Sequence, residues 1–292
     1  MLIFMALFYQ AIFCEILYAD NLITAMGSIF ENPMATGFAG HVLYVSESND
    51  TLLFVKSENF PAEIFISVFD SKTDKWSASE QIVFCNEITN ENSGSSKKKL
   101  FVSLKNKRGK FDLYSFMYCN GKCSNLSKLN ENINTSGNER SACVSEDHNT
   151  LYFSSDKKGG NGGYDIYKSE RLESGEWGTA QNLGAGINTK SDEDTPFILS
   201  DNVTLYFSSK AHGSIGGYDI FNSTLSEEGI WSSPENAGTT VNSMGDEKFC
   251  YLTADEKIFF YSSSTKNILQ KELNIFEFVN YNQEYTIKTS KQ

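Results

Sequence analysis

One part of this chain occurs twice, with a spacing of 54 residues and no insertion between the two copies. The run TLYFSS at 150–155 recurs at 204–209, and the run GGYDI at 162–166 recurs at 216–220. A fixed period of this length is typical of repeat proteins, in which each unit buries its faces against its neighbours. The 292 residues therefore fold as a series of similar units.

Each unit contains four short runs that are typical of β-strands and are separated by turn residues. In the clearest unit these runs lie at 142–145, 150–155, 164–169 and 177–183. Gly175 precedes the fourth run, where we expect it to take a positive φ in a hairpin turn. Short, evenly spaced strands in aromatic-rich units are typical of propeller blades. The sequence therefore predicts an all-β fold, a β-propeller of four-stranded blades.

The repeat continues outward in weaker copies, so that five units lie between about residues 37 and 285. Residues 20–36 could add a strand to the last unit and close the ring. We predict five blades within residues 20–292, and a sixth, degenerate blade at the N-terminus stays open as an alternative.

The aromatic residues of the repeat have fixed positions. All three tryptophans occupy one repeat position, just after the hairpin turn, and Cys123 takes that position in the second unit. Such rings can stack on sugars, but their repeated place favours packing between blades, because aromatic side chains supply much of a blade's buried area. The predicted structural residues are Trp76, Trp177, Trp231, Tyr164 and Tyr218.

The series LYFSS, GGYDIY, W, NLG, INT and DED resembles the repeat of the TolB-type, WD-repeat-like β-propellers of bacterial envelope proteins. The resemblance is strong across 138–263 and weaker across 40–137 and 264–285. It implies a role in envelope assembly or secretion. Such propellers often precede an OmpA-like, peptidoglycan-binding domain, which we do not expect here because the chain ends soon after the last unit.

Charge and the N-terminal segment bear on partners and location. The formal net charge is −12, without a Lys/Arg stripe to offset it, so nucleic acid and anionic membranes are poor partners. Residues 1–19 are strongly apolar and end at Ala19, which suits a signal peptide, while a lipidated Cys14 or an inner strand is the alternative. The run is too short and too broken for a confident membrane span. We expect an extracytoplasmic protein, periplasmic, associated with the outer membrane or secreted.

Two cysteines flank a tight-turn signal. Cys119 and Cys123 enclose Asn120-Gly121-Lys122, and in an oxidising compartment they could form a disulfide across a hairpin. The alternative is two free thiols, with Cys123 packed in place of a tryptophan. A zinc site would need two more ligands at matched spacing, which the sequence does not offer.

Acidic residues gather in particular loops of the repeat. Because strands alternate in direction, the loop between the second and third strands and the loop into the next unit emerge on one face. Carboxylates there could bind Ca²⁺ or a basic partner. Alternatively, a repeated Asp beside Gly-Gly accepts backbone N–H groups and fixes a turn. The candidate binding residues are Asp165, Asp192, Glu193, Asp219, Asp246 and Glu247.

No catalytic arrangement stands out from the sequence. His41, His148 and His212 occupy unrelated repeat positions, so a Ser-His-Asp arrangement has no support. A glycosidase needs only two carboxylates, and the chain has many. The leading hypothesis is a non-catalytic, exported interaction module of the bacterial cell envelope that binds a protein or glycan partner and needs no cofactor. The alternatives are a five-bladed carbohydrate-active enzyme and a soluble lectin.

Overall fold

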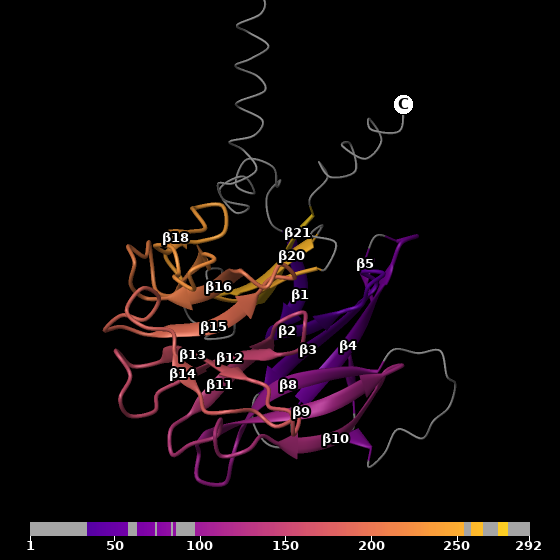
Figure 1. The fold of residues 1–292 in the computed structure, drawn as a ribbon. Coiled ribbons are helices and arrows are strands. Elements are labelled where there is room, and N and C mark those ends of the chain that lie inside the picture. Colours follow the sequence, from indigo (N-terminus) through magenta and orange to yellow (C-terminus); the bar gives the residue numbers. More distant parts are fainter. Residues whose placement is uncertain are drawn as a thin grey trace, which may run out of the picture.

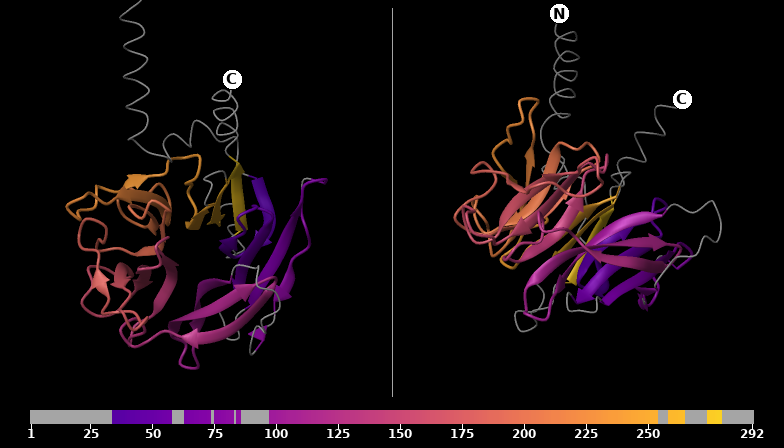
Figure 2. Two further views of the ribbon diagram at one scale, coloured as in Figure 1. Left: turned by 45° about the vertical axis from the view of Figure 1, so that its right-hand side comes forward. Right: turned by 60° about the horizontal axis from the view of Figure 1, so that its bottom comes forward.

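The computed structural model describes residues 34–57, 63–73, 75–82, 84–85, 97–253, 258–264 and 274–279. This part of the chain contains 21 strands and no helix (Figure 1). It therefore holds no helix that is long and apolar enough to span a bilayer. The sheets are arranged around a common centre (Figure 2), so the predicted all-β propeller is confirmed. The predicted leader, residues 1–19, lies outside the described residues.

The described strands form five sheets. The first contains β2 (His41–Val45), β3 (Thr51–Ser57), β4 (Glu63–Asp70) and β5 (Lys75–Trp76), with β6 (Glu80–Ile82) also pairing with β4. The second contains β8 (Lys98–Lys105), β9 (Phe111–Cys119), β10 (Lys122–Lys128) and β7 (Phe84–Cys85). The third contains β11 (Glu139–Val144), β12 (Thr150–Ser155), β13 (Asp165–Glu170) and β14 (Gln181–Asn182). The fourth contains β15 (Glu193–Ile198), β16 (Thr204–Ser209), β17 (Asp219–Thr224) and β18 (Glu235–Asn236). The fifth contains β19 (Glu247–Leu252), β20 (Ile258–Ser263), β21 (Asn274–Val279) and β1 (Met34–Ala39).

The innermost strands contact one another in a closed order, from β2 through β8, β11, β15 and β19 back to β2. In the fifth sheet β1 pairs antiparallel with β21, which places Ala35 opposite Phe276. An N-terminal strand therefore completes the last sheet, as predicted. It lies at Met34–Ala39 and overlaps only the end of the predicted segment 20–36.

The second sheet departs from the repeat. Its outermost strand, β7, precedes β8 in the chain and pairs parallel with β10. One residue separates β7 from β6, which pairs with β4 in the first sheet. The chain thus passes from the outer part of the first sheet to the outer edge of the second before it enters β8. In its sequence β8 matches the second strand of the other units, yet it is the innermost described strand of its own sheet.

The inner strands of the third, fourth and fifth sheets share a β-bulge. Ser141, Thr195 and Phe249 lie 54 residues apart and take φ values of 54°, 51° and 54°. At each of them the register with the next strand shifts. A bulge bends its strand and redirects nearby side chains. All three residues line a cavity between the inner strands, which we call the channel. The repeat therefore places one bulge residue of each of these strands in the wall of the channel.

The tryptophans pack between sheets, as predicted. Each contacts an aromatic ring of the preceding sheet in the ring. Ring centroids lie 6.4 Å apart for Trp76 and Phe260, 6.3 Å for Trp177 and Phe101, and 6.5 Å for Trp231 and Tyr152. Cys123, which replaces tryptophan in the second unit, is fully buried between the first two sheets.

A repeated asparagine also joins neighbouring sheets. The side chain of Asn188 accepts a hydrogen bond from the Ile166 N–H (2.8 Å) and donates one to the Ile166 carbonyl (2.9 Å). Asn134 binds Leu113, and Asn242 binds Ile220, in the same way. Each asparagine therefore fixes the third strand of one sheet to the loop that enters the next.

Candidate functional site

The two predicted sets of loops do lie on one side of the ring. The Gly163 N–H donates to the Ser191 carbonyl (3.0 Å), and the Gly217 N–H donates to the Gly245 carbonyl (2.8 Å). We call this side the loop face; it comprises residues 156–164, 188–194, 210–218 and 242–248. The opposite side, the hairpin face, carries the turns at 145–149, 171–176, 199–203 and 225–231, since successive strands are antiparallel.

Four of the six predicted binding carboxylates lie inside the loops. Asp165 accepts hydrogen bonds from the Gly162 N–H (3.1 Å) and the Asn182 amide (2.8 Å). Glu193 accepts two from Thr189, from its N–H and its hydroxyl, both at 2.7 Å. Asp219 and Glu247 repeat these contacts one unit later. All four are fully buried. Their oxygens accept hydrogen bonds within the loops, which supports the alternative role of fixing turns; a role of these carboxylates in binding stays a prediction.

The glycines beside these carboxylates are needed for space. A Cβ on Gly160 would lie 2.2 Å from an Asp165 oxygen, and one on Gly162 would lie 2.0 Å from the Ser191 carbonyl. Real Cβ atoms do not approach that closely. The Gly-rich runs therefore serve close packing of the loops.

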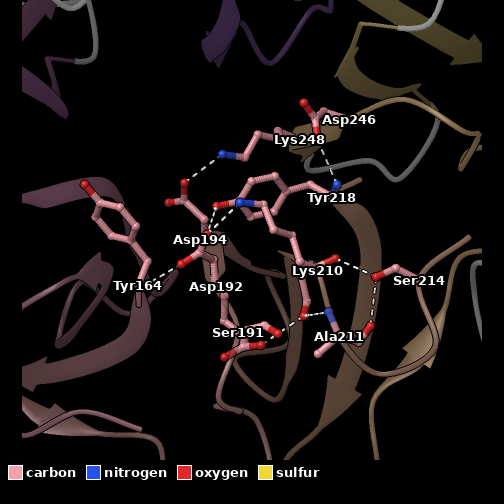
Figure 3. A network of polar contacts seen from close by, with 12 residues as sticks. Tyr164, Ser191, Asp192, Asp194, Lys210, Ala211, Ser214, Tyr218, Asp246 and Lys248 are labelled. Carbon is pink, nitrogen blue, oxygen red and sulfur yellow. Dashed lines mark hydrogen bonds and ion pairs between the residues drawn. The ribbon is translucent and has the colours of Figure 1, made fainter. Parts of the chain in front are cut away.

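Asp192 joins the third and fourth sheets at the loop face (Figure 3). It accepts a hydrogen bond from the Tyr164 N–H (3.1 Å), and its second oxygen binds the Lys210 ammonium (2.7 Å) and the Tyr218 hydroxyl (3.1 Å). Burial alone would raise the pKa of Asp192, but Lys210 and these hydrogen bonds bring the pKa below its ordinary value. Asp246 accepts the Tyr218 N–H in the same way (2.9 Å). Both carboxylates thus have structural partners and remain partly exposed.

Three charged residues meet at the start of neighbouring inner strands. Arg140, Asp194 and Lys248 occupy one repeat position in the third, fourth and fifth sheets. The Lys248 ammonium lies 2.8 Å from Asp194 Oδ2, and the Arg140 guanidinium lies 4.0 Å from the same oxygen. Burial opposes ionisation of Asp194, but Lys248 and Arg140 hold its pKa well below its ordinary value. A buried carboxylate is therefore shared by two cations from the sheets on either side.

Tyrosine rings cover these cations. The Lys248 ammonium lies 3.7 Å from the Tyr218 ring centroid, and the Arg140 guanidinium lies 5.1 Å from that of Tyr164, within cation–π range. Burial, followed by the charges of Asp194 and Asp192, raises the pKa of Tyr218. Its hydroxyl therefore stays a donor at neutral pH. We call Arg140, Asp194, Lys248, Tyr164 and Tyr218 the charged cluster.

A cavity of about 890 Å³ lies between the inner strands of the ring, beside the charged cluster. It is lined by residues from the innermost strand of every sheet, including Ser141, Thr195 and Phe249. The rings of His41 and Phe249 stack at 4.1 Å where the first and fifth sheets meet. The cavity also reaches turns on the hairpin face, among them Ser46–Glu47 and Ser145–Glu146.

The carboxylates near the loop face are already engaged by neighbouring groups. A glycosidase uses two carboxyl groups, one of which must be protonated to act as an acid. Asp194 is fully buried and held ionised between two cations. Asp192 and Asp246, which are partly exposed, each accept a backbone N–H. The loop face therefore presents polar groups that are already fixed, with charged and aromatic surfaces beside them.

The metal and disulfide predictions have different outcomes. The described residues contain no group of three or more His, Cys, Asp or Glu side chains that could hold a metal ion. Calcium binding stays a prediction. The Cys119–Cys123 disulfide is wrong: the two-residue turn forms, but Cys119 lies opposite Lys122, and Cys123 lies opposite Tyr118. Tyr118 and Cys119 are adjacent on β9, so their side chains point to opposite faces of the sheet. Cys123 lies opposite Tyr118, so its thiol points to the other face from that of Cys119.

The charged cluster is the part of the site that the sequence prediction missed. Its signal was present: Glu139, Glu193 and Glu247 are each followed by a charged residue, which is Arg, Asp and Lys in turn. When the residue at one repeat position changes the sign of its charge between neighbouring units, an ion pair across the interface between the sheets is predicted. Tyr164 and Tyr218, predicted as structural, are structural and also contact the cations of this cluster.

The chain is similar in fold to several solved structures. An α-L-arabinofuranosidase from Lactobacillus brevis is 11% identical, with a TM-score of 0.54 over 84% of this chain and 91% of that one. A thermostable family-43 glycoside hydrolase is 12% identical, with a TM-score of 0.52 over 85% of this chain and 88% of that one. TolB from Acinetobacter baumannii is 14% identical, with a TM-score of 0.42 over 81% of this chain and 52% of that one. No family model and no curated protein matches the chain. At identities this low, the two likenesses with TM-scores above 0.5 show a shared fold alone.

Proposed function

We propose that this chain is a non-catalytic interaction module, a five-bladed propeller whose loop face binds a protein or glycan of the bacterial cell envelope. The observation that carries the proposal is the state of Asp194, which is buried and shared by Arg140 and Lys248. A carboxylate so fixed stabilises the interface between sheets and is unavailable as an acid or a nucleophile. The apolar segment 1–19 supports the export of this module from the cytoplasm.

The contacts between the sheets support the proposed blade count. Five sheets are described, and their inner strands contact one another in a closed order. The pairing of β1 with β21 joins the N-terminal part of the propeller to its last sheet. Both observations support a complete ring of five blades.

The loop face carries side chains that suit a partner. Met244 is 80% exposed and Ile215 is 38% exposed, and their loops touch where Gly216 packs against Met244. The Lys210–Asp192 pair is also on this face and partly exposed. An apolar patch bordered by charged groups is typical of protein interfaces.

A matched pair of substitutions tests where the partner binds. The purified chain is cross-linked to envelope extract, and the captured component is identified and quantified by mass spectrometry. Met244→Asp on the loop face should reduce capture about tenfold, as loss of an interface hot spot does. Ile230→Asp changes an apolar residue on the hairpin face that is 67% exposed, and it should leave capture unchanged. Equal capture by both variants, or loss only with Ile230→Asp, would place binding elsewhere.

A further inference from the structure

The channel has the size and the lining of a small-molecule site. Its volume of about 890 Å³ lies within the range of known ligand pockets, roughly 300–1,000 Å³. Apolar side chains line much of it, among them Leu43, Phe101, Phe197 and Phe249. These residues lie on the inner strands, whose ladders of hydrogen bonds hold them in place. The cavity is therefore a preformed apolar space.

The end of the cavity at the hairpin face is basic. Lys97, Lys98 and Lys99 reach it at the start of β8, and Arg171 reaches it just after β13. Among the described residues that line this end, the acidic ones are Glu47 and Glu146, and His148 is also present.

The two acidic residues at this end act on Lys98. The Lys98 ammonium lies 3.1 Å from Glu47, and both Glu47 and Glu146 favour its charged form. Burial and then the positive charge of Arg171 lower the pKa of Lys99. Lys99 has no carboxylate within ion-pair distance among the described residues. Lys99 and Arg171 both line this end of the cavity, so two positive charges lie there.

We propose that the channel binds an organic anion, an apolar body with one carboxylate. The body lies between Phe101 and Phe197, and the carboxylate binds Lys99 and Arg171 at the hairpin face. A neutral apolar ligand would leave the two cations unscreened, and a bare inorganic anion would leave the apolar wall uncovered. The site is separate from the loop face, so the result of its test does not depend on whether the proposed partner binds.

Calorimetric titration of the full chain with phenylbutyrate tests the site. Phenylbutanol and phenylbutylamine are matched neutral and cationic probes, and decanoate replaces the aromatic body by an alkyl chain. Phenylbutyrate or decanoate should bind at least about tenfold more tightly than the alcohol, since one charge-assisted hydrogen bond is worth about this factor. The tighter of the two anions identifies the body as aromatic or alkyl.

Charge-removing variants locate the carboxylate. Lys99→Gln and Arg171→Gln should each weaken binding of the anions about tenfold and leave binding of the alcohol unchanged. Lys190→Gln, an exposed lysine of the loop face, is the matched control and should bind as the parent chain does. Thermal melting confirms that each variant is folded. Absence of anion binding, equal affinity for the alcohol, or unchanged affinity in both rim variants would overturn the proposal.

Discussion

The Lys248 ammonium and the Asp194 carboxylate lie 2.8 Å apart at the same repeat position of neighbouring sheets. Asp194 is fully buried, and Lys248 is nearly so. Ser154 donates a further hydrogen bond to Asp194, from the sheet on its other side. A carboxylate bound from both neighbouring sheets couples three consecutive units of the ring. The charged cluster therefore links neighbouring sheets at the end of the inner strands that is nearer the loop face.

Lys248→Met should destabilise the protein by about 3–5 kcal/mol, because removing one partner leaves Asp194 buried and less compensated. Urea unfolding measures this loss. Lys210→Met is the matched control: its pair with Asp192 is partly exposed and should contribute at most about 1 kcal/mol. Adding Asp194→Asn to Lys248→Met should restore part of the lost stability, since the two effects are coupled. Additive losses would show that the two side chains do not interact.

Stability should fall at low pH through Asp194. The pKa of Asp194 lies below its ordinary value of 3.8 in the folded chain, so ionisation favours the folded state. This contribution is fully present above the unfolded pKa and is lost as the pH falls toward the folded pKa. Asp194→Asn should therefore flatten the fall in stability below about pH 4.

Two other buried acids contribute with the opposite sign. Burial raises the pKa of Glu139 and of Glu247, so their contribution to stability falls as the pH rises from the unfolded pKa through the folded one. Denaturant melts at several pH values measure both effects. Glu173→Gln, on an exposed turn, is the control. An acid limb that is equally steep in Asp194→Asn and Glu173→Gln would rule out a special role for Asp194.

Asn242→Ala should cost about 1–3 kcal/mol, because the buried Ile220 N–H loses its Asn242 acceptor and the Ile220 carbonyl, which also accepts from the Ala237 N–H, loses one of its donors. The loss should appear as a lower midpoint of chemical unfolding. Gln181→Ala removes an exposed amide and should change the midpoint little. Equal midpoints for the two variants would show that the asparagine does not hold adjacent sheets together.

Gly216→Ala should destabilise the chain by about 1–3 kcal/mol, as overpacking does. Its Cβ would lie 2.3 Å from the Ser243 carbonyl oxygen. Gly186 has open space at that position and an ordinary φ, so Gly186→Ala should be neutral or slightly stabilising. Differential scanning calorimetry of the pair distinguishes a need for space from a general need for glycine. Similar shifts in both variants would count against the packing explanation.

The repeat could be predicted from the sequence because each of its recurring residues meets a local structural requirement, such as a turn or a packing contact. Gly175 takes a φ of 84° in its turn, as predicted, and Trp177 packs against the preceding sheet at the position that all three tryptophans share. No recurring residue in the sequence indicated that β7 would pair with β10 at the outer edge of the second sheet. This pairing depends on where β6 ends, which neither propensity nor periodicity determines.

The candidate site was harder to predict because burial is not visible in composition. Glu193 and Asp165 are acidic loop residues, yet both point inward onto backbone N–H groups. Asp194, adjacent in sequence, becomes part of the site only because the ring brings Arg140 and Lys248 to either side of it. The sequence shows that the charge at one repeat position changes sign from unit to unit. That these residues form ion pairs could be concluded only once the order of the sheets in the ring was known.

The most direct test of a non-catalytic propeller is the rate at which the purified chain hydrolyses a panel of nitrophenyl glycosides, arabinofuranosides included, beside its Asp194→Asn variant. Thermal melting of both proteins shows that the comparison is between folded chains. Because Asp194 is buried and ion-paired, we predict that neither protein releases nitrophenol faster than buffer alone. Release by the parent chain that Asp194→Asn abolishes would contradict the proposal and identify the loop face as an active site.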